Sequence, residues 1–368
     1  MLHLSVGPLV KVDNIIWFTT LNFNGLFKFD IDTLQIEFVY RFKFAKGLQE
    51  RMYTGKIIYY NDELFFFPYY YNRIVSYNIV TKTEKIILIA DFIPERLGVN
   101  TVIQKGTEVF FRSDVCLDFH VLDLVSKKVK KMDDIFPDIP KEQGGWSSLC
   151  EDRLLIVLAD RNSFIEITNN SKKYFKLPNY FNEWHLNRVY YDGELYWLLF
   201  GDNIDIYSWS AKTQEIERYK GDDSLEKNIL GYYLYFFSFE NEICILGNNY
   251  CGVFKINQVL KKIENLFQLP DDFKIINNIL DYTPFKEYEI IDKKLWLFPR
   301  SGNQLVIYDK EKNQVRGIEF SVEQQNIPDW SSLMIDRYIT NKEYITEGMF
   351  TLEDYIYLLK NIDSLTLC

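Results

Sequence analysis

The chain has 368 residues, of which 47% are apolar and 17% aromatic, and this amount of buriable surface excludes a disordered polypeptide. Its 52 acidic and 42 basic side chains give a net charge of -10 without a block of either sign. We therefore expect neither nucleic acid nor an anionic membrane as a partner, because both require a basic footprint. The 29 Phe and 26 Tyr residues favour strands over helices.

Neither the first residues nor the cysteines indicate export. Residues 1–7 (MLHLSVG) lack the charged and apolar regions of a secretory signal, and no stretch approaches the roughly 18 apolar residues of a membrane helix. We expect a cytoplasmic protein. The 5 cysteines show no C-x-x-C spacing, so they predict reduced, mostly buried thiols rather than a disulfide framework or a zinc site.

A two-strand unit recurs along the chain. The first strand of each copy is anchored on an apolar residue, and these anchors recur at similar intervals: Ile16, Leu64, Val109, Leu154, Leu195, Ile243 and Leu295. The second strand ends in an apolar residue followed by a small polar one. These pairs are Phe29-Asp30, Tyr77-Asn78, Leu122-Asp123, Ile167-Thr168, Trp209-Ser210, Ile256-Asn257 and Tyr308-Asp309. The separation of the two anchors is identical in six copies and one position longer in the fifth, which unrelated strand pairs would not produce.

The polar residue of each pair is Asp, Asn, Ser or Thr, whose side chain bonds the nearby backbone and starts a turn. A β-rich run precedes each first anchor, as at residues 56–60 and 188–191, and another follows the turn, as at 85–89. Four strands in about 46 residues are the content of one propeller blade.

The sequence therefore predicts an all-β fold: a β-propeller of about seven four-stranded blades, with six or eight as alternatives. The blades are expected to start near residues 1, 50, 98, 144, 184, 230 and 280 of a propeller domain spanning 1–348. The competing fold is a large β-sandwich, in which nothing enforces a four-strand period.

The run Leu305-Val306-Ile307-Tyr308-Asp309 resembles kelch-type propellers, whose blades carry a tyrosine-aspartate corner before the outer strand. The resemblance covers most of residues 1–320. The paired glycines of that family are missing, since 192–194 and 105–107 each keep one glycine. WD-type and quinoprotein-type propellers are alternatives. The resemblance implies a propeller from a family that consists mostly of binding and scaffolding modules, with a few enzymes.

Two further segments follow the seventh copy. Residues 328–333 (PDWSSL) echo 145–149 (GWSSL), so we expect a partial eighth repeat at 328–348, which either completes a sheet with the N-terminal residues or packs outside a finished ring. Residues 349–361 predict an amphipathic helix with a capping box at 351–354. We expect this helix to cover the outside or bottom of the ring, with partner docking through Thr351–Lys360 as the alternative.

Propellers bind ligands at the mouth of the central channel, where the loops that lead into the innermost strands converge. In the sequence these loops come shortly before the first anchors and carry the ligand-binding candidates Arg51, Tyr53, Asn100, Trp146, Ser147, Trp184, His185, Asn187, Tyr232, Tyr282 and Trp330. Aromatic platforms with a few polar groups suit a sugar or a peptide side chain. The alternative is that these aromatic residues plug the channel or wedge between blades.

The common catalytic and cofactor motifs are missing from the sequence. The chain has no glycine-rich phosphate loop, H-E-x-x-H or G-x-S-x-G, and its 3 histidines are not spaced as metal ligands. The acidic pairs at 133–134, 222–223 and 271–272 predict solvated turns.

We therefore expect no cofactor and no metal, and a non-catalytic binding or scaffold module that recognises a protein, peptide or glycan. The alternatives are an enzyme that acts on a carbohydrate or peptide, with His185 as the best candidate, and a structural subunit that docks through its C-terminal helix.

Overall fold

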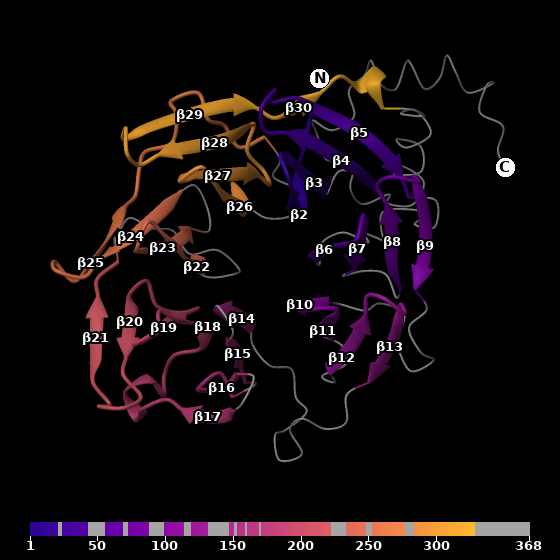
Figure 1. The fold of residues 1–368 in the computed structure, drawn as a ribbon. Coiled ribbons are helices and arrows are strands. Elements are labelled where there is room, and N and C mark those ends of the chain that lie inside the picture. The colour runs from indigo at the N-terminus through magenta and orange to yellow at the C-terminus, as the bar shows by residue number, and fades with distance from the viewer. Residues whose placement is uncertain are drawn as a thin grey trace, which may run out of the picture.

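The computed structural model describes residues 1–20, 24–42, 56–68, 73–87, 99–113, 119–131, 147–150, 153–158, 160–168, 171–221, 233–247, 252–276 and 283–327. Within them the chain forms seven four-stranded sheets arranged around a centre (Figure 1). The predicted all-β propeller with seven blades is confirmed. The expected partial eighth repeat at 328–348 and the expected helix at 349–361 lie outside the described residues.

Each blade consists of four consecutive antiparallel strands, hydrogen-bonded in chain order. Blades one to three contain β2 (Val6–Val12), β3 (Ile15–Thr20), β4 (Gly25–Asp30), β5 (Ile36–Arg41), β6 (Lys56–Tyr60), β7 (Glu63–Phe67), β8 (Ile74–Asn78), β9 (Thr83–Ile87), β10 (Val99–Lys105), β11 (Glu108–Ser113), β12 (Phe119–Asp123) and β13 (Lys128–Lys131). Blades four and five contain β14 (Ser147–Cys150), β15 (Arg153–Val157), β16 (Ser163–Ile167), β17 (Lys172–Lys176), β18 (Leu186–Tyr191), β19 (Tyr196–Phe200), β20 (Ile206–Trp209) and β21 (Ile216–Tyr219). Blades six and seven contain β22 (Tyr233–Phe239), β23 (Glu242–Gly247), β24 (Val253–Asn257), β25 (Lys262–Asn265), β26 (Phe285–Ile291), β27 (Lys294–Pro299), β28 (Gln304–Asp309) and β29 (Gln314–Glu319).

The constant separation of the two anchors has a simple structural origin. The anchors are cross-strand partners in the hairpin formed by the second and third strands, as shown by Leu64 opposite Tyr77. In the fifth copy Tyr196, and not the predicted anchor Leu195, lies opposite Trp209. The one longer separation was therefore a misplaced anchor, because β19 begins one residue later than the pattern suggested.

The polar residue after each second anchor caps the next turn in all seven blades. Each side-chain oxygen accepts a hydrogen bond from the backbone N–H three residues later. Asp30 Oδ1, for example, accepts the Thr33 N–H at 2.8 Å. The corresponding bonds join Asn78 to Thr81, Asp123 to Ser126, Thr168 to Ser171, Ser210 to Thr213, Asn257 to Leu260 and Asp309 to Lys312. At Asp30 and Asn78 the same oxygen also accepts the backbone N–H two residues on. Local turn chemistry thus repeats at every outer hairpin.

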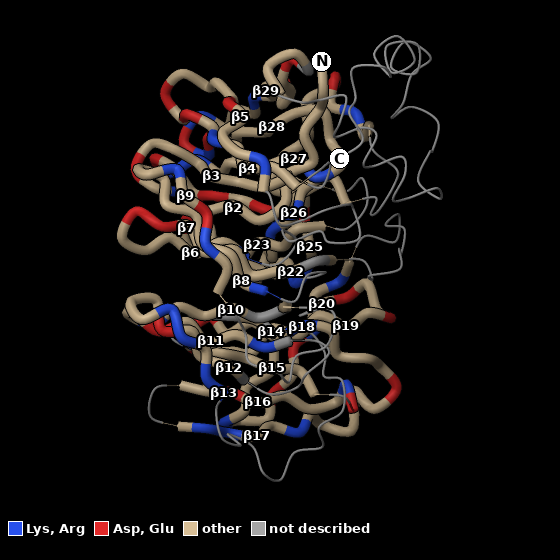
Figure 2. The backbone as a smooth tube through the Cα atoms, turned by 90° about the vertical axis from the view of Figure 1, so that its right-hand side faces the viewer, with Lys and Arg blue, Asp and Glu red and all other residues tan. Residues whose placement is uncertain are grey.

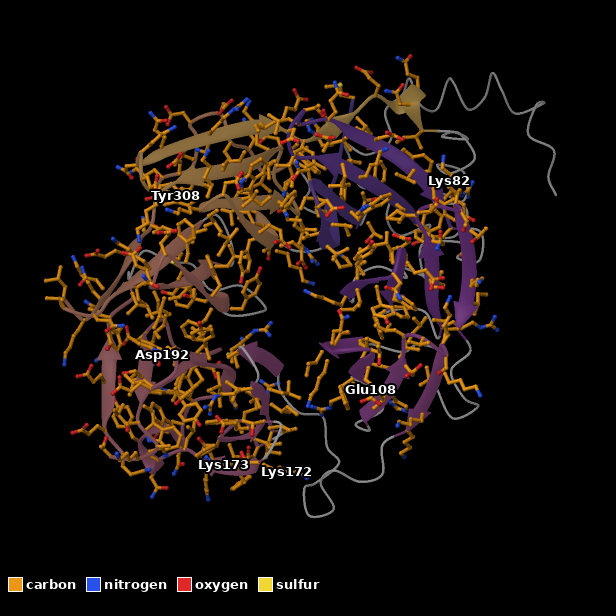
Figure 3. The ribbon with its side chains drawn as sticks, in the orientation of Figure 1. Lys82, Glu108, Lys172, Lys173, Asp192 and Tyr308 are labelled. Carbon is orange, nitrogen blue, oxygen red and sulfur yellow. The ribbon has the colours of Figure 1, made fainter. Side chains whose placement is uncertain are left out.

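The two middle strands of a blade are buried on both faces. In β7, Leu64 and Phe66 pack towards the first blade, while Phe65 and Phe67 pack towards the third. Alternate residues of a strand point to opposite faces, so an uninterrupted apolar run is what a strand between two neighbours requires. Side chains fill the spaces between the blades, as with Tyr308 between blades six and seven (Figure 3).

The ring closes through the two ends of the described chain. β1 (Leu2–His3) pairs with β30 (Ser321–Val322), and the Leu4 N–H donates to the Phe320 carbonyl at 3.1 Å. The Phe320 ring packs against rings from blades one and seven, at Phe18, Phe29 and Phe298. The first blade keeps its own four strands, so no strand is exchanged at the closure.

Charged residues gather in the turns and along outer strands such as β17 (Figure 2). The connections from the fourth strand of one blade to the first strand of the next, and from the second strand to the third, lie at one end of the ring, because neighbouring strands are antiparallel. We call this end the mouth face. Its described segments include 177–185, 201–205 and 300–303.

The turn between β26 and β27 holds side chains in an unfavourable backbone conformation. Asp292 and Lys293 both have positive φ, at 48° and 60°. Two-residue hairpin turns of this kind prefer glycine at the second position, because glycine enters the left-handed region without steric cost. The turn therefore stores a small amount of strain that a substitution can release.

Replacing Lys293 by glycine is expected to stabilise the fold by about 0.5 to 1 kcal/mol, measured as the free energy of unfolding in urea. The side-chain ion pair with Glu311 spans 3.3 Å between groups that are 71% and 69% exposed, so its loss costs little. The control is Lys212→Gly in an exposed turn without positive φ, where no gain is expected. A destabilised Lys293→Gly protein would contradict the prediction.

Candidate functional site

The first strand of every blade faces the centre of the ring (Figure 1). β2, β10, β18, β22 and β26 each have a register shift near their start, at the mouth face. Two predicted ligand-binding residues, Asn100 and Asn187, lie at these shifts in blades three and five. A bulge re-aims the side chains around it, so the start of an inner strand is where a propeller can present groups to a ligand.

An aromatic shelf lies on the mouth face beside blade five. It is built on the 3-10 turn η2 (Asn179–Phe181) and consists of Tyr180, Phe181, Trp184, Phe200 and Tyr207. The Trp184 ring is 5.1 Å from Tyr207 and 5.5 Å from Tyr180, measured between centroids. Phe181, Phe200 and Tyr207 are buried, Trp184 is half-buried, and Tyr180 is 56% exposed. The shelf is therefore a rigid apolar base with exposed ring surface above it.

A buried carboxylate, Asp205, directly precedes β20, the strand that carries Tyr207 of the shelf. The Asp205 carboxylate accepts a hydrogen bond from Arg218 Nε at 2.6 Å and another from the Gly221 backbone N–H at 2.8 Å. A side chain at Gly221 would collide with the Ile204 backbone, since an added Cβ would lie 2.5 Å from its carbonyl oxygen. Two residues on, burial raises the pKa of the Tyr207 phenol, which therefore stays neutral at physiological pH.

His185 follows the shelf and is paired with an acid. Its Nδ1 bonds Oδ2 of Asp202, which also accepts the His185 backbone N–H at 3.3 Å. The side chains are 61% and 40% exposed, so the pair stands at the surface. A carboxylate on Nδ1 orients the ring and leaves Nε2 directed away from the pair.

Polar and charged residues occupy one register position on several inner strands. Arg188 lies opposite Leu199, Tyr235 opposite Leu246, and Glu287 opposite Phe298, which are corresponding positions of blades five, six and seven. Lys56 holds the same position in blade two. We call Lys56, Arg188, Tyr235 and Glu287 the channel row. Its described members are partly buried, except Lys56, which is exposed.

Tyr235 links blade six to blade seven. Its hydroxyl donates to the Lys286 carbonyl of the next blade, and its ring lies 6.0 Å from that of Tyr288. Burial raises the pKa of Tyr235, and the negative charge of Glu287 raises it further, while Arg188 and Arg300 act to lower it. Burial lowers the pKa of Arg188 from 12.5 to about 10, so this guanidinium remains charged at neutral pH.

Two carboxylates lie on the same side of β26. Burial raises the pKa of Glu287, against the lowering influence of Lys56, Lys286 and Arg300. Burial also raises the pKa of Glu289, two residues on, again against Lys56. The inner wall therefore holds several ionisable groups that act on one another across blade boundaries.

The predicted site residues divide into three groups. Trp184, His185 and Asn187 lie together at the shelf and the start of β18, while Asn100 and Ser147 lie at the starts of β10 and β14. The remaining six predictions lie outside the described residues: Arg51, Tyr53, Trp146, Tyr232, Tyr282 and Trp330.

Sequence reasoning missed Tyr180, Asp202 and the channel row. The row had a usable signal, because Lys56, Tyr235 and Glu287 each precede their anchors, Leu64, Ile243 and Leu295, by the same number of positions. Arg188 bears the same relation to Tyr196 and was obscured by the choice of Leu195 as anchor. No pattern in the sequence indicated Asp202, because it lies 17 positions after His185 and meets it only where the chain folds back.

Three other features bear on the chemistry of the described part of the chain. Its residues include no group of three side chains placed to hold a metal ion. No helix among them is long and apolar enough to cross a membrane. Cys150 and Cys244 are buried free thiols, as predicted for cysteines of this kind.

Comparison with known proteins identifies the fold. No protein-family model matches the chain, nor does any curated protein. Among solved structures, a streptogramin B lyase is similar at 14% identity and a TM-score of 0.55, covering 82% of this chain and 93% of that one. YCF48 bound to D1 peptide is similar at 8% identity and a TM-score of 0.57, with 83% and 94% covered. The N-terminal domain of Nup159 is similar at 11% identity and a TM-score of 0.53, with 82% and 88% covered.

These structures show that the chain is a seven-bladed β-propeller. They are propellers of various kinds, including a lyase and a protein solved with a peptide, and they do not single out the kelch type. The similarity extends to the fold alone.

Replacing Glu287 by glutamine is expected to raise the free energy of unfolding at neutral pH. Burial raises the pKa of Glu287 in the folded protein above its ordinary value of 4.5. At pH values between 4.5 and that raised pKa, the folded state therefore binds more protons than the unfolded state. Stability therefore falls as the pH rises through that window, and glutamine removes this loss. The gain should disappear as the pH falls below 4.5.

Urea unfolding of both proteins at pH 7 and about pH 4 measures this effect. The control is Glu183→Gln at an exposed position beside the shelf, where no pH-dependent gain is expected. A Glu287→Gln protein that is less stable than the parent at pH 7 would refute the assignment.

Proposed function

We propose that this protein is a non-catalytic binding module that recognises a peptide segment of a partner protein at the mouth of its central channel. The observation that carries the proposal is the aromatic shelf beside blade five, where exposed ring surface at Tyr180 and Trp184 adjoins the His185–Asp202 pair. Aromatic anchors with a few directed polar groups are typical of peptide-binding surfaces. The peptide bound to YCF48 is a precedent for this class of ligand on a similar fold.

Several narrower features belong to the same proposal. A scaffold role, a kelch-like origin and a cytoplasmic location fit a propeller of this composition. A glycan is the other ligand that stacking on Tyr180 and Trp184 would suit. Partner docking through Thr351–Lys360 stays a prediction, because that segment lies outside the described residues.

The second candidate function is an enzyme that acts on a carbohydrate or a peptide. It is favoured by the carboxylate on Nδ1 of His185, since this arrangement orients an imidazole for proton transfer through Nε2. The similarity to streptogramin B lyase shows that a related ring can support catalysis in another protein. The two candidates share the same surface and differ in whether the bound molecule is converted.

The test of the proposed function is a binding screen of the purified protein against an immobilised peptide library and a glycan array. Affinities of the ligands found are then measured by fluorescence polarisation for the parent and Trp184→Ala. Loss of the ring should weaken binding by at least about tenfold, as expected for an aromatic anchor. The matched control, Tyr174→Ala, removes a 57%-exposed ring from the outer strand β17 and should leave binding unchanged.

A second variant guards against misfolding, because Trp184 also packs 5.5 Å from Phe200. His185→Gln alters an exposed side chain and should also reduce affinity. Binding that survives both substitutions would show that the ligand is recognised elsewhere. Turnover of a bound ligand that His185→Gln abolishes would establish the enzyme instead.

A further inference from the structure

The outer strands of the blades differ in charge. β5, β9, β21, β25 and β29 each carry one acidic and one basic side chain, so each of these strands is neutral. β13 and β17 instead carry three lysines each and no acid. These two strands belong to blades three and four, which are neighbours in the ring. A chain with a net charge of -10 thus has a basic region on two adjacent blades.

Four of these lysines lie on the sides of blades three and four that face each other: Lys128, Lys130, Lys172 and Lys176. On β13, Val129 packs into the cluster shared with blade two, so the lysines on either side of it point towards blade four. On β17, Phe175 packs into the cluster shared with blade five, so the even-numbered side chains of this strand point towards blade three. All four lysine side chains are exposed, and Figure 3 shows Lys172 at the outer edge of the ring.

Arg112 of β11 lies on the same side of blade three. Its neighbour Phe111 packs towards blade two, so Arg112 points towards blade four. The apolar contact between blades three and four consists of Leu154 and Ile156, with Ile103 packed against them. Within the described part of the chain, this cluster is smaller than those between the other blades. The interface between blades three and four therefore combines a small apolar contact with a buried cation.

Arg112 has no counter-charge among the residues that the structure describes. It is 8% exposed, and its Nε forms no hydrogen bond with them. Burial lowers the pKa of its guanidinium. A buried cation without a counter-ion costs free energy, which a bound anion would recover. We call Arg112, Lys128, Lys130, Lys172 and Lys176 the basic seam.

Two acids lie on the same side of blade three. Glu108 and Asp123 are cross-strand partners, and Asp123 also lies opposite Lys128. Asp123 caps its turn, since its Oδ1 accepts the Ser126 N–H at 2.6 Å. Glu108 lies 3.9 Å from Lys130, between side chains that are 45% and 72% exposed. The five cations of the basic seam therefore outnumber the two acids beside them.

We propose that the basic seam docks an acidic, extended segment of a partner protein along β17. β17 is the end strand of its sheet, so one edge of its backbone has no strand partner in the described part of the chain. An extended polypeptide can pair with such an edge through its main chain. Side chains of the added strand repeat every two residues, so acids at alternate positions would lie beside Lys172 and Lys176.

The observations favour a polypeptide over other polyanions. Lysines on an edge strand discourage pairing with apolar or basic strands, which leaves a strand of opposite charge as the preferred partner. A long nucleic acid or a membrane would also meet the remainder of a chain whose net charge is -10. The basic seam is built by blades three and four and is separate from the aromatic shelf, so this inference goes beyond the proposed function.

The test uses fluorescence polarisation with two labelled peptides, one of alternating glutamate and threonine and one of alternating lysine and threonine. The parent protein should bind the acidic peptide preferentially, and affinity should fall as salt is raised. The double variant Lys128→Gln with Lys176→Gln, which removes one charge from each blade, should weaken binding by roughly fivefold or more. Glu108→Gln should strengthen binding, because it removes one of the acids beside the seam.

The matched control is the double variant Lys82→Gln with Lys173→Gln, which removes the same number of positive charges (Figure 3). Lys82 lies in the turn after β8, and Lys173 lies on the side of β17 that faces blade five. This variant should leave affinity nearly unchanged. Equal weakening by the two double variants would show a general electrostatic effect and would overturn the basic seam. Equal binding of the two peptides would overturn it as well.

Hydrogen exchange locates the bound peptide and separates this inference from the proposed function. The acidic peptide should slow exchange of the backbone amides of residues 172–176, and Trp184→Ala should leave its affinity unchanged. Protection confined to residues 177–185, with affinity lost in Trp184→Ala, would place the acidic peptide on the aromatic shelf and overturn the seam. Protection at β17, with no ligand found for the shelf, would support the seam while the proposed function fails. Preferential binding of single-stranded RNA or of anionic vesicles, abolished by the Lys128 and Lys176 substitutions, would overturn the choice of a polypeptide.

Discussion

The fold depends on the burial of both faces of each four-stranded sheet. The middle strands carry apolar side chains on alternate sides, so a single blade would expose a full apolar face to water on each side. Phe66 and Phe67, neighbours in β7, belong to the two different interfaces of the second blade. Burial of such side chains contributes about 1.5 to 3 kcal/mol each, and only a closed ring provides a neighbour for every face.

Ring closure also creates the polar surface at the centre. The first strand of each blade pairs on one edge only, and its other edge faces the centre of the ring (Figure 1). Arg188, Tyr235 and Glu287 lie on these strands and are partly buried. Burial favours the neutral form of each side chain, so it lowers the pKa of Arg188 and raises the pKa of Tyr235 and of Glu287. The same geometry that removes apolar faces from water thus confines charged groups from several blades in one channel.

The shelf at blade five illustrates how local and long-range features combine. The turn at η2 brings Tyr180, Phe181 and Trp184 close together in sequence and in space, so an aromatic cluster could be expected there. The pairing of His185 with Asp202 needed the loop between β19 and β20 to return to the start of β18. The ion pair between the buried Asp205 and the exposed Arg218 had no signature in the sequence.

The sequence by itself determined the features that depend on neighbours along the chain. The constant separation of anchors follows from a hairpin of fixed length, and the turn-starting residues, such as Asp30 and Asn78, follow from side chains that bond the backbone close by. Only the tertiary structure decided which residues meet across blades. The Tyr235 hydroxyl reaches the Lys286 carbonyl of the next blade, and β1 pairs with β30, because the ring closes, and closure is a property of all seven interfaces at once.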